Sequence, residues 1–496
     1  MSTVFLLVPL AAPVLTAAVY LLAGWRSTTV WVGVGSAVAV LAASIGVAVS
    51  VVETGPFTAM AGFVRADGLS AFMLLVIGAV SVLTTAATPN YFEVEIEARR
   101  ATARTAARHS LLVQVFLAAM TLTVVAADLG VLWVAIEATT IVTAFLVGQR
   151  RTRTAVEAAW KYVVICSAGI ALALLGTVIL NFASSQAGAG GLNMAALADH
   201  AWDLDPAVTR MAVVLLILGF GAKAGLAPLH AWLPDAHSEA PAPVSALMSG
   251  VLLSVAFYAI LRVKIIADHA LGAEFARGIL AVIALATLLV SALLLLTQRD
   301  YRRMLAYSSI EHLALVALGA AIGSRLAVAA ALLHILGHGL VKGVLFLAAG
   351  HILQETRTSQ IDEIRGLASR FPVLAACFGL GVLALIGLPP FSLFASELGI
   401  ARAGFASTLN WVTAAALVLV LIIAATLLTH VSRMLLGTPK GDGKSSVSTG
   451  VAIRVRTGTI AAAAMAGGLA VSAVIGVAAG PLAPVLHLAA DTITRN

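Results

Sequence analysis

Ionisable side chains lie inside stretches of this chain that are otherwise apolar. Three of the six lysines, Lys161, Lys223 and Lys342, fall within such stretches, although a lysine at the centre of a bilayer costs about 2.5–3.5 kcal/mol. Similar stretches hold the acids Glu137, Glu311 and Glu397 and the histidines His334 and His338. Burial raises the pKa of a carboxylate and lowers that of an ammonium group, which brings both closer to pH 7. A nearby opposite charge reverses each of these changes. These residue types therefore indicate proton transfer.

Three of these groups share one face of a helix. His334, His338 and Lys342 follow one another at i, i+4 and i+8, which places them on one stripe about 12 Å long. Such a stripe can hold a row of waters, and a proton wire is the favoured interpretation. Interhelical hydrogen bonding is an alternative. A metal site is a third, but no nearby third ligand is obvious from the sequence.

Two helices are expected to break beside an ionisable group. Lys223 lies in a glycine-rich segment and is followed by Pro228, and Pro389 and Pro390 interrupt another apolar run ahead of Glu397. Proline removes a backbone donor and clashes with the preceding turn, and a broken helix is tolerated only beside protein or a wet cavity. A weaker candidate for proton entry is the cytoplasmic turn after Pro228, and simple loop polarity explains it equally well; its polar residues are His230, Asp235, His237 and Glu239.

The composition requires these groups to be carried by membrane helices. The 496 residues are 61% hydrophobic and 11% charged, against about 25% charged in soluble domains. Cys166 and Cys377 are the only cysteines, which excludes an iron–sulfur ligand set and a disulfide framework. We expect no cofactor and no metal. The net charge of +7 reflects arginines in short loops that set topology, not nucleic-acid binding.

The chain is predicted to be an all-α polytopic membrane protein of about fourteen helices, because the apolar runs are too long and too continuous for barrel strands. The predicted spans are 2–24, 30–52, 68–89, 110–127, 129–148, 155–182, 207–230, 241–263, 275–297, 302–322, 326–354, 371–401, 408–434 and 457–480. A Gly/Ser/Lys linker is expected at 438–450. About 16 residues follow the last span, too few for a further domain or a long lateral helix.

The spacing of the two breaks predicts internal symmetry. Pro228 and Pro389 are 161 positions apart, about five helices, and an odd number of crossings inverts the orientation of equivalent elements. The expected divisions are therefore 1–108 for the first three helices, 109–264 and 265–435 for two inverted five-helix repeats, and 436–496 for the linker and helix 14. Helices 7 and 12 are the broken ones.

Charge asymmetry predicts the orientation. Loops placed on the cytoplasmic side hold 19 of the 30 lysines and arginines, and loops on the other side hold eight. Both termini are therefore predicted to lie outside the plasma (inner) membrane of a prokaryote, with the first apolar run retained as a helix.

Several segments resemble a known group of membrane subunits. They are KAGLAPLHAWLPDAHSEAPAPVSALMSG (223–250), IEATT (136–140), AAWKYVVIC (158–166), QRDYRRMLAYSSIEHLAL (298–315) and ALIGLPPFSLFASE (384–397). They are similar to the antiporter-like, proton-conducting subunits of respiratory complex I, Mrp-type sodium/proton antiporters and membrane-bound hydrogenases, with IEATT, AAWKY and SSIEH most like the F component of the hydrogenase-4 type. The resemblance implies fourteen helices, two inverted repeats and a hydrated polar axis.

The resemblance also implies roles for particular residues. Glu137 matches a fifth-helix glutamate, Lys161 a sixth-helix lysine, Lys223 the broken-helix lysine, His334, His338 and Lys342 the eleventh-helix polar row, and Glu397 the twelfth-helix acid or base. The chain departs from many complex I members at the eighth helix, where Ser249 and Ser254 replace a lysine or histidine. The connection between the two halves is then expected to depend on water, or on Glu311 and His312.

The expected function is proton translocation without redox chemistry in this chain. Glu137 would pair alternately with Lys161 and Lys223, and separation of the pair would send the proton toward the histidine row and Glu397. Other membrane subunits, a peripheral nickel–iron hydrogenase, formate dehydrogenase or iron–sulfur module, and the lipid bilayer are the expected partners. The alternatives are cation/proton exchange, energising of inorganic-carbon uptake through a zinc-containing partner, and a structural subunit with silent charges.

Overall fold

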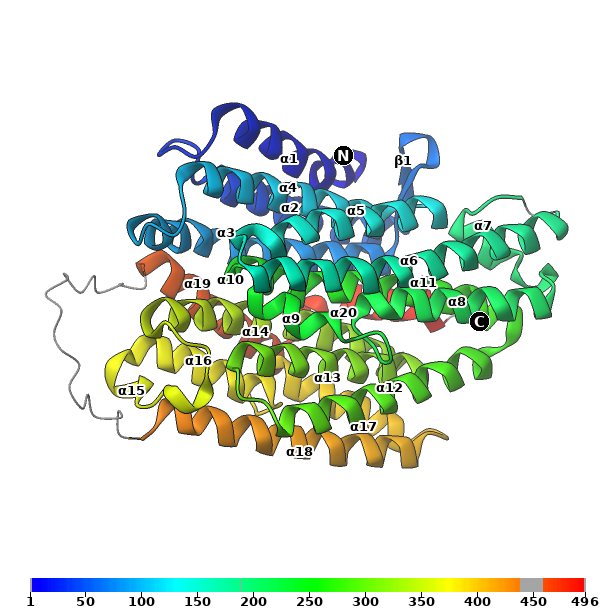
Figure 1. Cartoon of the computed structure of the whole chain (residues 1–496). Helices are drawn as coiled ribbons and strands as arrows, with labels where there is room; N and C mark the ends of the chain where they lie inside the picture. Colours follow the sequence, from blue (N-terminus) through cyan, green and yellow to red (C-terminus); the bar gives the residue numbers. More distant parts are fainter. Residues whose placement is uncertain (1, 189, 438–457, 495–496) are drawn as a thin grey trace, which may run out of the picture.

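The computed structural model describes residues 2–188, 190–437 and 458–494, and within them the chain is a bundle of long helices (Figure 1). The predicted linker at 438–450, with Lys440 and Lys444, lies outside the described residues, as do Arg454, Arg456 and Arg495. The helices lie side by side from α1 at one edge of the bundle to α18 at the other. Helix α14 runs through the middle, against α3, α10, α13, α16, α17, α19 and α20.

The helices are α1 (Ser2–Ala23), α2 (Val32–Thr54), α3 (Gly68–Glu97), α4 (Ala103–Val125), α5 (Leu129–Val147), α6 (Arg153–Gln186), α7 (Met194–Asp199), α8 (Pro206–Ala224), α9 (Trp232–Glu239), α10 (Ala242–Leu247), α11 (Leu253–Leu271), α12 (Ala273–Leu296), α13 (Tyr301–Ile322), α14 (Arg325–Thr356), α15 (Leu367–Arg370), α16 (Pro372–Leu385), α17 (Ser392–Phe405), α18 (Asn410–Leu435), α19 (Thr459–Val477) and α20 (Ala483–Thr494).

Thirteen helical segments in the described part of the chain are long and apolar enough to cross a membrane, in agreement with a polytopic, mainly helical fold. The remaining predicted span, 371–401, consists of two shorter helices, α16 and α17, of 14 residues each. Neither is long enough to cross the roughly 30 Å apolar layer alone. The count of fourteen crossings, the two inverted repeats and the division at 108, 264 and 435 therefore stay predictions.

Capping side chains fix where the helices that carry the candidate site begin. An aspartate, threonine or serine accepts a hydrogen bond from the first turn of α5, α6, α8, α13 and α14, which satisfies backbone donors that have no partner within the helix. These caps are Asp128, Thr152, Asp205, Asp300 and Ser324. Helix α6 is the longest helix in the described residues, at 34 residues.

Both predicted breaks interrupt helices close to their prolines. Helix α8 ends at Ala224, and Gly225 follows with φ +78° before the non-helical segment that contains Pro228. Helix α16 ends at Leu385, and α17 begins after Pro389 and Pro390. A third irregularity was not predicted. The span Ala242–Leu271 contains a π-helical turn, Met248–Leu252, between α10 and α11.

Two small elements add to the predicted helices. Strands β1 (Phe57–Ala59) and β2 (Val64–Ala66) form an antiparallel hairpin before α3, so the fold is helical with one short hairpin. The residues after the last predicted span form the 12-residue helix α20, which packs on α3 and α14. Its buried residues, Val485, Leu486, Ala489, Ala490 and Ile493, recur at helical spacing and form an apolar stripe.

Candidate functional site

Lys223 lies at the end of α8 and is fully buried, with 0% of its surface exposed. Its ammonium donates hydrogen bonds to Thr140 Oγ1 of α5 at 2.8 Å and to the hydroxyl of Tyr162 of α6, and lies 4.7 Å from the centre of the Tyr162 ring. Glu137 is one helical turn before Thr140, and its buried Oε2 has no hydrogen-bond partner in the protein. Thr140 thus holds Lys223 one helical turn away from Glu137, and among the described residues no direct ion pair joins this acid to this lysine.

The broken segment after Lys223 is held in place by two side chains. Trp232 at the start of α9 donates from its indole Nε1 to the carbonyl of Ala222 at 2.9 Å. Its ring also packs edge-on against Tyr162, at 4.9 Å between ring centres. Arg302 of α13 donates to the backbone carbonyls of His237, Ser238 and Ala240 at the end of α9. These contacts satisfy backbone groups that the break leaves without helical partners.

Lys161 does not lie where the sequence predicted it. Its side chain is 48% exposed and pairs with Glu157 at 2.8 Å and Asp235 at 3.0 Å, not with Glu137. Lys161 is near the start of α6, so its long side chain reaches the polar end of the span, while the next residue, Tyr162, faces Lys223. Asp235 also pairs with Arg303 of α13 at 2.9 Å, which ties α6, α9 and α13 together.

The histidine row of α14 is buried, and His334, His338 and Lys342 are each at most 1% exposed. His334 Nε2 lies 2.9 Å from His312 Nδ1 of α13, and His334 Nδ1 lies 2.9 Å from Ser396 Oγ of α17. The ring of His338 is centred 5.2 Å from that of His312, and neither of its nitrogens has a protein partner. Imidazoles arranged in this way can relay a proton by exchanging donor and acceptor roles.

Glu397 of α17 joins this histidine cluster. One ligand atom from each of His312, His334 and Glu397 lies within 4.8 Å of the other two. This group includes His334 but not His338, so it differs from the histidine pair that the sequence offered as a metal site, and its three side chains could hold a divalent ion if they moved closer together. Glu311, next to His312 on α13, is 4% exposed and its Oε2 has no protein partner. The acids Glu311 and Glu397 thus accompany the histidines at the second half of the site.

The sequence matches one family over most of this region. The family described as NADH:quinone oxidoreductase/Mrp antiporter, TM, matches residues 126–423, which include every site residue described above. This chain belongs to that family. A hydrogenase-4 component F homolog of Methylacidiphilum infernorum is 37% identical to this antiporter-like subunit over 383 residues, which cover 77% of this chain and 80% of that protein.

Two further relatives extend the comparison. NADH-quinone oxidoreductase subunit N of Desulforudis audaxviator is 39% identical over 272 residues, 54% of this chain and 52% of that protein, so this chain spans about half the length of that relative. A chain of the membrane-bound sulfane sulfur reductase, an archaeal respiratory membrane complex, superposes with a TM-score of 0.85 and 26% identity, over 99% of this chain and 97% of that one.

Hydroxyl groups link Lys342 of this antiporter-like subunit to the π-helical turn Met248–Leu252. Lys342 donates to Ser308 Oγ at 2.5 Å and to the carbonyl of Leu305 at 2.6 Å. The same carbonyl accepts from Ser309, whose hydroxyl lies 2.8 Å from that of Ser249 in the π-helical turn. Ser249 is therefore linked through Ser309 to the backbone carbonyl that also accepts from Lys342.

Sequence reasoning missed the hydroxyl groups that surround the charged residues. Tyr162 and Thr140 hold Lys223, Ser308 holds Lys342, and Ser396 holds His334. Serine and threonine are common in membrane helices, so their presence alone gives no signal. The sequence did offer one usable sign, because Thr140 is three positions after Glu137 and shares its helix face.

Proposed function

We propose that this chain is a proton-translocating membrane subunit of a multisubunit redox-driven complex, of the hydrogenase-4 or complex I type. The observation that carries the proposal is the set of ionisable groups inside the membrane helices: the buried Lys223, Lys342 and histidines, with the half-buried acids Glu137 and Glu397 beside them. In the described residues both lysines are held by hydroxyls or a carbonyl, and no carboxylate pairs with either directly. Neutral hydrogen-bonding groups can accompany a lysine in either protonation state, whereas a fixed ion pair would hold the charge.

Transfer begins at the first helix break. Lys223 keeps its proton while an ionised Glu137 lies near it, because the opposite charge offsets the cost of burial. When Glu137 is drawn to another partner, the ammonium loses that support and releases its proton. Lys161 is not the alternating partner of Glu137, because it lies at the polar end of the span and pairs there with Asp235.

The released proton passes toward the second half through hydroxyl groups and water. Ser249, Ser309 and Ser308 lead to Lys342, and the histidine cluster leads from there to Glu397. Serine hydroxyls both donate and accept, so they can carry a proton although they do not store one near pH 7. Glu311 and the unpartnered nitrogens of His338 provide further acceptors along α13 and α14.

The native complex, purified and reconstituted in sealed vesicles, tests this proposal through the number of protons moved per electron. Glu137→Gln and Lys223→Ala are each expected to lower that number, because each removes one member of the acid–lysine pair. Arg277→Gln, which removes an exposed ion pair with Glu274, serves as the control and should leave it unchanged. Intact assembly with an unaltered ratio in both charge variants would overturn the proposal and leave a structural role.

Cation/proton exchange is a second candidate because the family that matches this chain includes Mrp antiporters. Backbone carbonyls freed at the two helix breaks are suitable ligands for sodium. The same vesicles separate the two functions: proton movement that requires sodium, in the absence of electron transfer, favours exchange.

The remaining expectations concern the surroundings of the chain. We place it in the plasma membrane of a prokaryote with both termini outside, and we assign its energy supply to a peripheral iron–sulfur, hydrogenase or dehydrogenase module. Support comes from the loop arginines and from the multisubunit nature of the complex I and sulfane sulfur reductase relatives. Identification of the proteins that copurify with this chain tests the partner assignment.

A further inference from the structure

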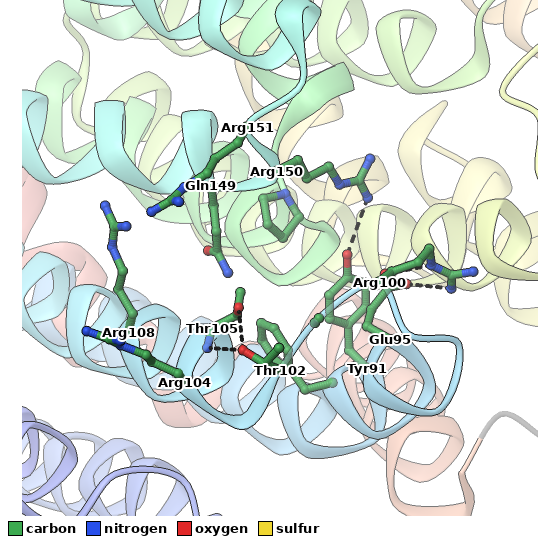
Figure 2. Close-up of a pocket in the computed structure, with 13 residues that line it drawn as sticks. Tyr91, Glu95, Arg100, Thr102, Arg104, Thr105, Arg108, Gln149, Arg150 and Arg151 are labelled. Atoms are coloured by element: carbon green, nitrogen blue, oxygen red, sulfur yellow. Dashed lines mark hydrogen bonds and ion pairs between the residues drawn. The ribbon is translucent and has the colours of Figure 1, made fainter.

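A cavity of about 600 Å³ lies at the helix ends that are predicted to face the cytoplasm. Its lining comes from the end of α3, the loop into α4, the first turns of α4, the segment Gly148–Arg150 after α5, and the start of α10 (Figure 2). Five arginines line it: Arg100, Arg104, Arg108, Arg150 and Arg151. We call this cavity the arginine pocket. It is separate from the buried row of lysines and histidines.

The arginine pocket has a large excess of positive charge. Its one acid, Glu95, is taken by Arg100 through two hydrogen bonds of 2.8 Å. Arg150 donates to the hydroxyl of Tyr91 at 3.3 Å, and it has no ion pair with a described carboxylate. Among the described residues no carboxylate pairs with the other three arginines of the pocket.

Arginines line the arginine pocket from two sides. Figure 2 shows Arg104 and Arg108 on one wall together with Thr102 and Thr105, and Arg151 and Gln149 across from them. Guanidinium groups bind phosphate oxygens through paired N–H donors, and hydroxyl and amide groups add further donors. A phosphate-bearing ligand is therefore the chemistry that this lining fits, and the volume leaves room for more than one phosphate.

The surface below the arginine pocket indicates where the rest of the ligand lies. On α5, Phe145, Ile141 and Val134 are 52%, 56% and 57% exposed, and their spacing places them on one face. Helix α4, which packs beside α5, adds Val115, seven residues after Arg108. The Arg108 guanidinium lies 5.9 Å from the centre of the Phe145 ring, which joins the charged pocket to the apolar face.

The dimensions match a lipid. From Phe145 to Val134 the helix rises about 16 Å, close to half of the roughly 30 Å apolar layer of a bilayer. Basic pockets between membrane helices on the cytoplasmic side are known to hold anionic lipid headgroups. A soluble phosphate compound would use the arginines but not this apolar face.

We propose that the arginine pocket binds the headgroup phosphates of an anionic phospholipid whose acyl chains lie along the exposed faces of α4 and α5. A lipid with two phosphates, such as cardiolipin, fits the cavity and the charge best. Occupation neutralises arginines that otherwise repel one another and joins the α3–α4 loop to the end of α5.

Binding is tested on the purified complex by native mass spectrometry and by thermal unfolding with cardiolipin or with phosphatidylcholine. Wild type is expected to bind cardiolipin and to unfold at a higher temperature with it. Arg104→Gln/Arg108→Gln should weaken cardiolipin binding roughly 25-fold, since each basic residue near the headgroup contributes about a factor of five. Arg99→Gln/Arg153→Gln is the matched control, because it removes two exposed arginines near the same helix ends that do not line the cavity.

Two further measurements distinguish the possible occupants and guard against misfolding. Arg104→Lys/Arg108→Lys keeps the positive charge but loses the paired N–H donors, so its cardiolipin binding should lie between those of wild type and the Gln variant. Thermal unfolding in phosphatidylcholine alone shows whether each variant is folded. Equal protection by pyrophosphate and cardiolipin would overturn the lipid assignment in favour of a free phosphate ligand. Equal cardiolipin binding by wild type, control and Gln variants would overturn it outright. If the Gln variant lost a copurifying protein while cardiolipin binding stayed unchanged, the pocket would be assigned to a protein partner.

Discussion

Lys223 has two hydroxyl partners, and one of them can be removed with little change in the volume of the site. Tyr162 lies on α6 beside Lys161, yet only Tyr162 reaches Lys223, because successive residues of a helix point about 100° apart. Lys161 instead pairs with the exposed Glu157 and the half-buried Asp235, and ion pairs near the surface contribute little to stability. Mutation of Tyr162 should therefore affect proton translocation much more than mutation of Lys161.

We expect Tyr162→Phe to slow proton translocation several-fold, because the Lys223 ammonium loses a hydrogen-bond acceptor in a buried site. Lys161→Gln should have a smaller effect, since Asp235 keeps Arg303 as its partner. The rate of proton movement into sealed vesicles that contain the complex is the measurement. A larger loss in Lys161→Gln than in Tyr162→Phe would contradict the arrangement described for α6.

A second residue-scale prediction concerns Asp67, which caps α3 just outside the membrane span. Burial raises the pKa of Asp67, but the guanidinium of Arg262, at 2.6 and 2.7 Å from its carboxylate oxygens, outweighs burial and lowers the pKa to about 2 from the usual 3.8. Because the pKa is lower in the folded state, the pair stabilises the fold fully above about pH 4. This stabilisation, about 2 kcal/mol, is lost as the pH falls toward 2.

The unfolding temperature of wild type should therefore fall between pH 4 and pH 2 more steeply than that of Asp67→Asn. The variant should be less stable than wild type at pH 7, since Arg262 stays buried without its partner, and the two should converge near pH 2. Parallel pH profiles for the two proteins would show that the ion pair does not carry this dependence.

At the scale of the element, the break after α8 depends on one glycine. Gly225 has φ +78°, and a Cβ there would lie 2.5 Å from Leu233 Cδ1. Both the backbone conformation and the close side chain disfavour any other residue. Gly221, one turn earlier on α8, would place a Cβ no closer than 3.8 Å to any neighbour.

Gly225→Ala is thus expected to lower the free energy of unfolding by about 1–3 kcal/mol and to reduce proton translocation by displacing Lys223. Gly221→Ala should change neither by much. Thermal unfolding and vesicle assays on both variants provide the comparison. Equal behaviour of the two alanine variants would be incompatible with a fixed left-handed turn at Gly225.

At the scale of the whole molecule, the Ser249–Ser309 contact joins the two predicted repeats. Ser249→Ala should slow transfer between the halves while leaving assembly intact. Ser81→Ala is the control, because within the described part of the chain the Ser81 hydroxyl donates to carbonyls of its own helix, those of Ile77 and Gly78. Proton translocation that is equally fast in both variants would move the connection elsewhere, toward Glu311 and His312.

The sequence was sufficient to predict most spans, because apolar length and flanking arginines carry that signal directly. It was also sufficient for the breaks, because proline and glycine act locally. It was not sufficient to predict which way Lys161 points, since α6 is apolar around most of its circumference and its pattern does not define an inner face. The approach of Glu397 to His312 and His334 depends on the packing of α13, α14 and α17, which no local pattern specifies.

The 34 residues of α6 have a further consequence for the outline of the molecule. Such a helix is about 51 Å long, and even a tilt of 40° leaves it about 39 Å tall against a roughly 30 Å apolar layer. Figure 1 shows that α6 and the adjoining α7 project past most of their neighbours at one end. The end of α6 therefore projects from one surface of the membrane. A soluble molecule that approaches this surface would contact α6 before the rest of the protein.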